Sequence, residues 1–232
     1  RARARRDARR AGSSAAVMAD ALKLARDLGH PVEDLNVGGG LGIRYVASDD
    51  PPSIEQWVKV VADAVTAACR DRQLELPRLL CEPGRSLVAT AGVTLYTVGS
   101  RKTIPGIRTY VAIDGGMSDN PRPITYQSLY TCCVADRPLA PAEETVNLVG
   151  KHCESGDVLL KDLPLPTTKS GDIVAMFSTG AYNASMSSNY NRIPRPAAVV
   201  VQSGHSELVQ KREQPDDLLR YDVLPDRFKA LH

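Results

Sequence analysis

Apolar residues recur at helical spacing in two segments near the start of the chain, and this pattern predicts two amphipathic helices. The first helix is expected over residues 13–28, before Gly29 and Pro31. The second is expected over residues 53–72, where Ser53 and Gln56 have the spacing of a capping box. The apolar positions of the first amphipathic helix are Val17, Ala21, Leu24, Ala25 and Leu28, and the expected buried residues of the second are Ile54, Trp57, Val58, Val61, Val65 and Ala68.

Short apolar runs alternate with these helices. Residues 33–37 and residues 78–81 are each predicted to form a strand. Helix, strand, helix and strand in this order are typical of a βα-repeat with parallel strands. Functional groups in such repeats gather at the ends of the strands. The residues that follow the two runs, Gly38–Gly40 and Glu82–Arg85, are therefore candidates for a binding site.

The pattern changes after about Ser86, where short strands punctuated by proline and glycine replace the helices. The sequence therefore predicts an α/β domain over residues 18–90, a β-rich domain over residues 91–212 and a C-terminal segment over residues 213–232. A short helix is expected over residues 216–220. The predicted strands of the β-rich domain are 92–98, 109–114, 145–150, 172–177, 197–202 and 207–212.

The composition fits a globular protein and narrows the range of partners. Hydrophobic residues make up 43% of the 232 residues and charged residues 24%, which are ordinary proportions. The net charge of +2 implies no polyanionic partner such as a nucleic acid. No apolar run is long enough to span a bilayer, so no membrane association is expected.

The basic residues gather at Arg1–Arg10, and no apolar segment follows them, which excludes a secretory signal. We expect residues 1–17 to be a non-native or disordered start. A transit peptide and a nucleic-acid-binding tail are the alternatives. The five cysteines are odd in number and include no CxxC pair for zinc or redox chemistry. They indicate the reducing cytoplasm.

The first candidate site combines glycines with charged side chains. Gly38–Gly40 let successive backbone N–H groups converge on an anion, and a tight turn is the alternative. This loop is not a dinucleotide fingerprint, because Ile43 or Tyr45 stands where that pattern requires glycine. Glu82–Arg85 places a carboxylate and a guanidinium around Gly84, where a backbone can approach a ligand. A surface ion pair on a turn is the alternative.

Other candidates lie in the β-rich region. Arg122 and Tyr126 are four residues apart. The guanidinium of an arginine can bind a carboxylate through two parallel hydrogen bonds, so this pair is a candidate carboxylate site. The alternative is a solvated arginine in a proline-rich loop. Cys153–Glu154 follows an apolar strand among polar neighbours, which argues against simple core packing. Tyr182 follows Gly180–Ala181, and its ring and hydroxyl suit contact with a bound cofactor.

Taken in order, these motifs resemble those of diaminopimelate decarboxylase, which depends on pyridoxal 5'-phosphate (PLP), from about Leu22 to about Arg212. The resemblance implies the C-terminal part of a (β/α)8 barrel followed by a β-rich domain. It also implies decarboxylation of meso-2,6-diaminopimelate to L-lysine and CO2. The residues implied to hold PLP are Gly38, Gly39, Gly40 and Gly84 at the phosphate, Glu82 at the pyridine nitrogen and Tyr182.

The same resemblance assigns the substrate contacts. Arg85, Arg122 and Tyr126 would bind the distal carboxylate, which separates diaminopimelate from substrates whose distal group is a cation. Glu154 would contact the distal amine, and Cys153 would return a proton after decarboxylation. In the family this cysteine comes from the partner subunit, so a cytoplasmic homodimer with a shared active site is implied.

The chain departs from the family pattern at its start. None of its eight lysines has the Tyr-x-x-Lys-Ala-Asn context that attaches PLP, and the family's ring-stacking histidine is also absent. We expect a protein truncated at its N-terminus, inactive alone and prone to aggregate. The alternatives are a non-catalytic partner of a complete enzyme and a related PLP decarboxylase acting on arginine or carboxynorspermidine.

Overall fold

The computed structural model describes residues 2–229, with side chains from 14 to 228, and forms two compact units. Unit 1 extends to Val93 and includes Phe177–Ala181, and unit 2 holds the remaining residues.

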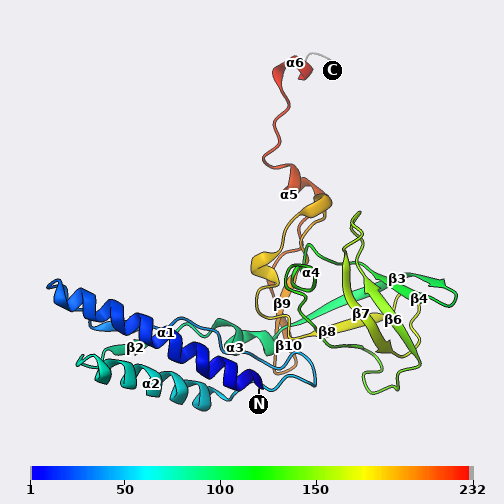
Figure 1. The fold of residues 1–232 in the computed structure, drawn as a ribbon. Helices are drawn as coiled ribbons and strands as arrows, with labels where there is room; N and C mark the ends of the chain where they lie inside the picture. Colours follow the sequence, from blue (N-terminus) through cyan, green and yellow to red (C-terminus); the bar gives the residue numbers. More distant parts are fainter. Residues whose placement is uncertain (1, 230–232) are drawn as a thin grey trace. The chain divides into compact units, whose positions relative to one another are not determined.

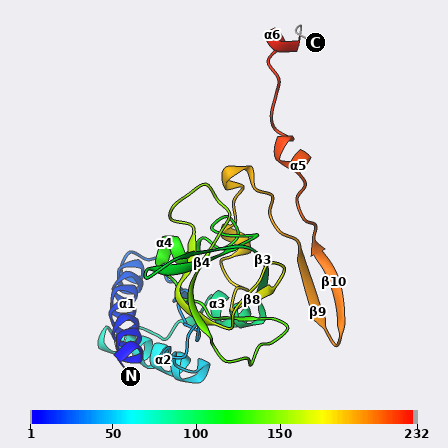
Figure 2. The ribbon, with the colours of Figure 1, turned by 90° about the vertical axis from the view of Figure 1, so that its right-hand side faces the viewer.

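Unit 1 is built on two long helices and a short parallel sheet. Helices α1 (Ala2–Asp27) and α2 (Ile54–Asp71) run side by side (Figures 1 and 2). Strands β1 (Asp34–Asn36) and β2 (Arg78–Leu80) pair in parallel, as the βα-repeat predicted. Since α1 begins at Ala2, residues 2–12, which lie in the segment expected to be a non-native or disordered start, have a helical backbone.

The predicted buried face of α1 is wrong. Ala15 and Ala19 are buried, whereas Val17, Leu24 and Leu28 are 61–69% exposed. The buried alanines belong to a core cluster with Ala68 and Cys69 of α2, among other residues. Small side chains allow two helices to approach closely, so the contact uses the alanines and leaves the larger residues outside.

Helix α2 begins as predicted but is buried over only half its length. The Ser53 hydroxyl accepts from the Gln56 N–H (3.2 Å), and the Gln56 side chain accepts from the Ser53 N–H (3.0 Å). Val61, Val65 and Ala68 are buried, as expected. Ile54 and Val58 are exposed instead, because the core cluster of unit 1 reaches only the later turns of the helix.

Unit 2 is built on a six-stranded sheet in the order β5-β8-β3-β4-β6-β7. β4 and β6 are parallel, whereas β3 and β4, β6 and β7, and β5 and β8 pair in antiparallel fashion. This confirms the predicted β-rich domain. The strands are β3 (Val93–Ile104), β4 (Arg108–Ile113), β5 (Cys132–Val134), β6 (Glu144–Val149), β7 (Val158–Leu165) and β8 (Ile173–Phe177).

Two strands of this sheet were not predicted. β7 contains Pro164, which weakens a strand prediction because proline cannot donate to the ladder. The structure places β7 at the edge of the sheet, where one row of N–H groups needs no partner strand. β5 has only three residues, which are too few to show the alternation of apolar and polar residues from which a strand is predicted.

The C-terminal part of unit 2 adds a separate antiparallel ribbon of β9 (Ala198–Gln202) and β10 (His205–Gln210) (Figure 2). Both strands were predicted within a few residues. The remaining described helices are short. α3 (Gly84–Val88) belongs to unit 1, and α4 (Arg122–Tyr126), α5 (Pro215–Leu219) and α6 (Asp226–Lys229) belong to unit 2. Short 3-10 turns cover Ala89–Ala91, Ala184–Met186 and Tyr190–Arg192. Within the described residues, none of the helices has both the length and the apolar character required to cross a bilayer.

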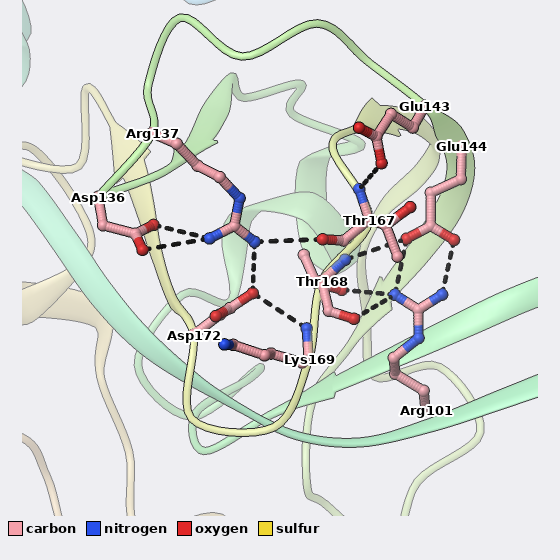
Figure 3. A network of polar contacts seen from close by, with 9 residues as sticks. All are labelled: Arg101, Asp136, Arg137, Glu143, Glu144, Thr167, Thr168, Lys169 and Asp172. Carbon is pink, nitrogen blue, oxygen red and sulfur yellow. Dashed lines mark hydrogen bonds and ion pairs between the residues drawn. The ribbon is translucent and has the colours of Figure 1, made fainter.

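Two arginines hold the loop that joins β7 to β8 (Figure 3). Arg101 contacts both carboxylate oxygens of Glu144 at 2.6 Å and donates to the backbone oxygen of Thr168 (2.8 Å). Arg137 contacts Asp172 at 2.6 Å, and the same carboxylate accepts from the Lys169 N–H (3.0 Å). Bidentate and charge-assisted bonds of this kind are the stronger ones in proteins. They fix a loop without regular secondary structure to the sheet.

We predict that this network makes unit 2 less stable to unfolding at acid pH. The hydrogen bond from Arg137 lowers the pKa of Asp172, and that from Arg101 lowers the pKa of Glu144. A lowered folded-state pKa contributes stability that is present above the unfolded pKa, about 4, and is lost as the pH falls through the folded value. Urea unfolding of the chain should therefore show a loss of stability below about pH 4.

Asp172→Asn tests the contribution of one pair. Its carboxylate is 4% exposed, so its replacement should cost about 1–3 kcal/mol at neutral pH and flatten the acid dependence. Asp136→Asn is the control, since Asp136 also contacts Arg137 but is 72% exposed and should change stability by less than about 0.5 kcal/mol. Equal effects of the two substitutions would contradict this account.

Candidate active site

In unit 1 the predicted site residues follow two paired strand ends. The Val37 N–H donates to the Leu80 oxygen (3.0 Å), and the Glu82 N–H donates to the Gly38 oxygen (2.8 Å). Backbone pairing thus continues past β1 and β2 into the glycine loop, Gly38–Gly40. The structure therefore brings this loop and Glu82 together at the carboxyl edge of the small sheet, as expected.

Asn36 connects the two segments through its side chain. Its Nδ2 donates to Glu82 Oε1 (2.7 Å), and its Oδ1 accepts from the Gly38 N–H (2.8 Å). The Glu82 carboxylate is exposed but fixed in direction by this bond. Asn36 was not predicted to have a role, and only the geometry reveals that it orients the candidate acid.

Two residues of the glycine loop have a left-handed backbone, which is common in anion-binding loops. Gly38 and Gly40 have positive φ angles of 71° and 107°. Left-handed residues next to right-handed or extended ones turn successive N–H groups inward. A Cβ on Gly39 would lie 2.3 Å from the backbone oxygen of Glu82, so that position has no space for a side chain. These features fit the phosphate of PLP. Gly84 and Arg85 follow in α3, where Gly84 is exposed and Arg85 is half-buried.

In unit 2 the carboxyl group of Asp157 joins two loops. Its Oδ1 accepts from the Met117 N–H (2.8 Å), and its Oδ2 accepts from the His152 N–H (3.0 Å). The same Oδ2 lies 2.6 Å from His152 Nδ1. Both side chains are buried, with exposed fractions of 2% and 0%. Asp157 therefore fixes the loop after β4 to the turn between β6 and β7.

Two glycines provide the space for this carboxyl group. A Cβ on Gly150 would lie 2.0 Å from Asp157 Oδ2, and a Cβ on Gly116 would lie 2.5 Å from the same atom. Gly116 also has a φ angle of 153°. The glycines of the motifs in unit 2 thus serve the packing of a buried polar pair.

A second carboxyl group, that of the partly buried Asp119, stabilises the loop after β4. Asp119 accepts from the Gly116 N–H (2.7 Å) and from the Tyr96 hydroxyl (2.5 Å). Burial raises the pKa of Asp119, and burial with the nearby Asp119 charge raises the pKa of Tyr96 well above its usual value. These groups act as structural supports for the loop that leads to Arg122.

Cys153 and Glu154 occupy the same turn as the buried pair but are exposed. The Glu154 N–H donates to the His152 oxygen (2.8 Å), and the Asp157 N–H donates to the Glu154 oxygen (3.1 Å). These bonds close the turn tightly. The polar neighbourhood predicted around Cys153 therefore consists of two pairs. His152 and Asp157 are buried, whereas Cys153 and Glu154 are exposed to solvent.

Three other cysteines are unsuited to thiolate chemistry. Burial raises the pKa of the Cys69 and Cys133 thiols, and it raises the pKa of Cys132 to about 12. This agrees with the structural role expected for them. All five cysteines have free thiols. Across the described residues, no cluster of three or more histidine, cysteine or acidic side chains is placed to bind a metal ion.

Arg122 and Tyr182 lie together in unit 2. The guanidinium carbon of Arg122 is 5.6 Å from the centroid of the Tyr182 ring and 5.8 Å from that of Tyr130. Its Nη1 donates to the Tyr130 hydroxyl (2.7 Å). Arg122 is only 6% exposed, so the alternative of a solvated arginine is wrong. Tyr126, one turn later in α4, is 62% exposed.

The predicted site residues thus divide between the two units. Gly38, Gly39, Gly40, Glu82, Gly84 and Arg85 belong to unit 1, and Arg122, Tyr126, Cys153, Glu154 and Tyr182 belong to unit 2. Tyr182 has a φ angle of 66°, an uncommon conformation for a tyrosine. Residues held in this way are concentrated at functional sites.

Comparison with known proteins gives one consistent family. A family model described as "Pyridoxal-dependent decarboxylase, C-terminal sheet domain" matches residues 19–180. Diaminopimelate decarboxylase of Synechocystis sp. is 57% identical over 200 residues, which are 86% of this chain and 43% of that protein. The corresponding protein of Bacillus subtilis is 50% identical over 189 residues, 82% of this chain and 43% of that protein.

A solved structure agrees with these relatives. Diaminopimelate decarboxylase from M. jannaschii, in complex with L-lysine, has a TM-score of 0.82 and 34% identity, and the match covers 92% of this chain and 48% of that chain. The present chain thus spans about half the length of the proteins that it matches.

We predict that substitution by alanine lowers the stability of unit 1 at Gly39 but not at Gly42. Gly39→Ala would place a Cβ 2.3 Å from a backbone oxygen and should destabilise unit 1 by about 1–3 kcal/mol. In Gly42→Ala the nearest atom, in Pro51, would be 3.9 Å away, so this control should be neutral or about 0.5 kcal/mol more stable. Urea unfolding measures both, and a neutral Gly39→Ala would refute the close packing of the glycine loop.

Proposed function

The chain belongs to the pyridoxal-dependent decarboxylase family, and from this we propose that it forms the C-terminal part of a diaminopimelate decarboxylase. The proposed reaction converts meso-2,6-diaminopimelate to L-lysine and CO2, the last step of lysine biosynthesis. The similarity to the diaminopimelate decarboxylases of Synechocystis sp. and Bacillus subtilis supports this substrate, and so does the L-lysine bound to the M. jannaschii enzyme.

The observation that carries the proposal is the exposed Cys153–Glu154 pair on a turn fixed by the buried His152 and Asp157. A thiol and a carboxylate exposed on a rigid support are available to a ligand. The pair has no part in the core of unit 2, so packing does not account for it. In the proposed reaction Glu154 accepts a hydrogen bond from the distal amine and Cys153 gives a proton to the carbon that lost CO2.

PLP, when bound, supplies the electron sink that decarboxylation requires. Gly38, Gly39, Gly40 and Gly84 are proposed to surround its phosphate, where the absence of side chains lets the backbone approach the anion. Glu82 is proposed to keep the pyridine nitrogen protonated, with Asn36 holding that carboxylate in direction. Tyr182 is proposed to contact the cofactor.

Arg85, Arg122 and Tyr126 are proposed to bind the distal carboxylate of the substrate. Arg122 supports this role because a buried guanidinium favours an anion much more strongly than an exposed one. A decarboxylase for arginine or carboxynorspermidine would place a cationic distal group against these residues, which costs free energy. We therefore prefer diaminopimelate to these substrates.

The proposed assembly is a homodimer in which Cys153 and Glu154 serve the cofactor of the partner subunit. The proposed location is the cytoplasm, and the five free thiols support a reducing compartment.

A fusion enzyme tests these proposals. The part of the Synechocystis decarboxylase that precedes the matched region is joined in front of residue 19, and the purified fusion and the 232-residue chain are each assayed for L-lysine with PLP and meso-diaminopimelate. We expect lysine from the fusion and none from the chain alone. A fusion that folds and binds PLP but releases no lysine would reject the proposed reaction.

We predict that Cys153→Ala lowers kcat of the fusion about a hundredfold or more, because the proton donor is lost. Cys133→Ala is the matched control, since burial raises the pKa of Cys133 and this residue lies in β5 outside the proposed site. The control should change kcat by less than about twofold. Steady-state kinetics with meso-diaminopimelate measures both, and an unchanged kcat in Cys153→Ala would exclude Cys153 as the proton donor.

A further inference from the structure

A segment outside the proposed site, Ser188–Asn191, lies against the exposed Cys153–Glu154 pair. The Tyr190 hydroxyl is 3.4 Å from Glu154 Oε2. The Asn191 side-chain oxygen accepts from the Cys153 N–H (3.0 Å). The sequence assigned no role to either residue, yet both contact the two groups that are proposed to act on the substrate.

Both oxygens of the Glu154 carboxylate have neighbours that restrict it. Oε1 accepts from the Gly156 N–H (3.1 Å) within the turn. Oε2 faces the Tyr190 hydroxyl from the other segment. The carboxylate remains exposed, so its position is set by two neighbours while its charge is available to a cation. An exposed glutamate without such contacts would lose more conformational freedom on binding an amine.

Tyr190 rests on the buried polar pair. Its ring is nearly parallel to the His152 ring, with 13° between the planes and 6.0 Å between the centroids. His152 is held in turn by Asp157 at 2.6 Å. The position of the Tyr190 hydroxyl therefore depends on the same pair that fixes the turn.

The segment itself is anchored on both sides. The Ser188 N–H donates to the Ser118 oxygen (2.8 Å), and Asn189 Nδ2 donates to Glu213 Oε2 (2.6 Å). Asn191 has a φ angle of 55°, which asparagine tolerates better than most residues. These contacts hold the segment as a rigid support rather than a free loop.

We propose that Tyr190 is a positioning residue that sets the preference for a substrate with a distal amine by holding the Glu154 carboxylate. This inference rests on the proposed function of Glu154. The 3.4 Å separation is long for a hydrogen bond between oxygens, and such bonds often shorten when the substrate binds.

Tyr190→Phe in the fusion enzyme tests the proposal with two substrates. One is meso-diaminopimelate, and the other is D-2-aminopimelate, which keeps both carboxylates and the reacting amine but lacks the distal amine. We expect kcat/KM for meso-diaminopimelate to fall about tenfold, mainly through KM, and kcat/KM for the analogue to change less than about twofold. An equal loss for both substrates, or no loss for either, would overturn the proposal.

A double-mutant cycle separates positioning from a general structural effect. If Tyr190 acts through Glu154, adding Tyr190→Phe to Glu154→Gln should lower kcat/KM for meso-diaminopimelate by less than about twofold further. A full additional tenfold loss would show that Tyr190 acts independently and would overturn the proposal. Tyr221→Phe is the matched control, because Tyr221 is 80% exposed and lies outside these contacts.

The parent fusion distinguishes this inference from the proposed function. A parent that releases no lysine rejects the reaction, and the role of Tyr190 falls with it. A parent that releases lysine while Tyr190→Phe fails to discriminate between the two substrates rejects only the positioning role.

Discussion

The buried carboxyl group of Asp157 is the constraint on which the chemistry of unit 2 depends. Removing a carboxyl group from water costs free energy unless hydrogen bonds replace its hydration. Here the N–H groups of Met117 and His152 and the His152 ring supply that replacement. Because these donors come from two loops, the group cannot be satisfied unless both loops are in place. A local energetic requirement thus fixes the relative position of distant segments.

Unit 1 meets a similar requirement with a different side chain. Asn36 donates to Glu82 and accepts from Gly38, so one amide side chain makes hydrogen bonds to residues that follow each of the two strands. The missing side chain of Gly39 then lets the two backbones approach each other. In unit 1 this glycine provides space for a backbone, whereas in unit 2 Gly116 and Gly150 provide space for the Asp157 carboxyl group. The conformational freedom of glycine matters mainly where φ is positive, as at Gly38 and Gly40.

Much of the fold follows from periodicity, and the errors have identifiable causes. The capping box at Ser53 is local chemistry, so the sequence contained the full signal for it. The buried face of α1 is not local, since Ala19 and Leu24 both satisfy a helical pattern and the close approach of α2 selects the alanine. The edge strand β7 was missed because Pro164 is acceptable only at an edge, which the sequence does not reveal.

The candidate site was predictable as a set of residues but not as an arrangement. His152, Cys153, Glu154 and Asp157 stand in one short polar run, and nothing in its composition tells which are buried. The turn decides this, because its backbone bonds direct His152 and Asp157 inward and leave the other two exposed. Tyr190 was harder to find, since its link to Glu154 spans 36 positions of sequence. Residues that contact a ligand often have recognisable chemistry, whereas residues that position them are defined by contacts between distant segments, and only a structure supplies those.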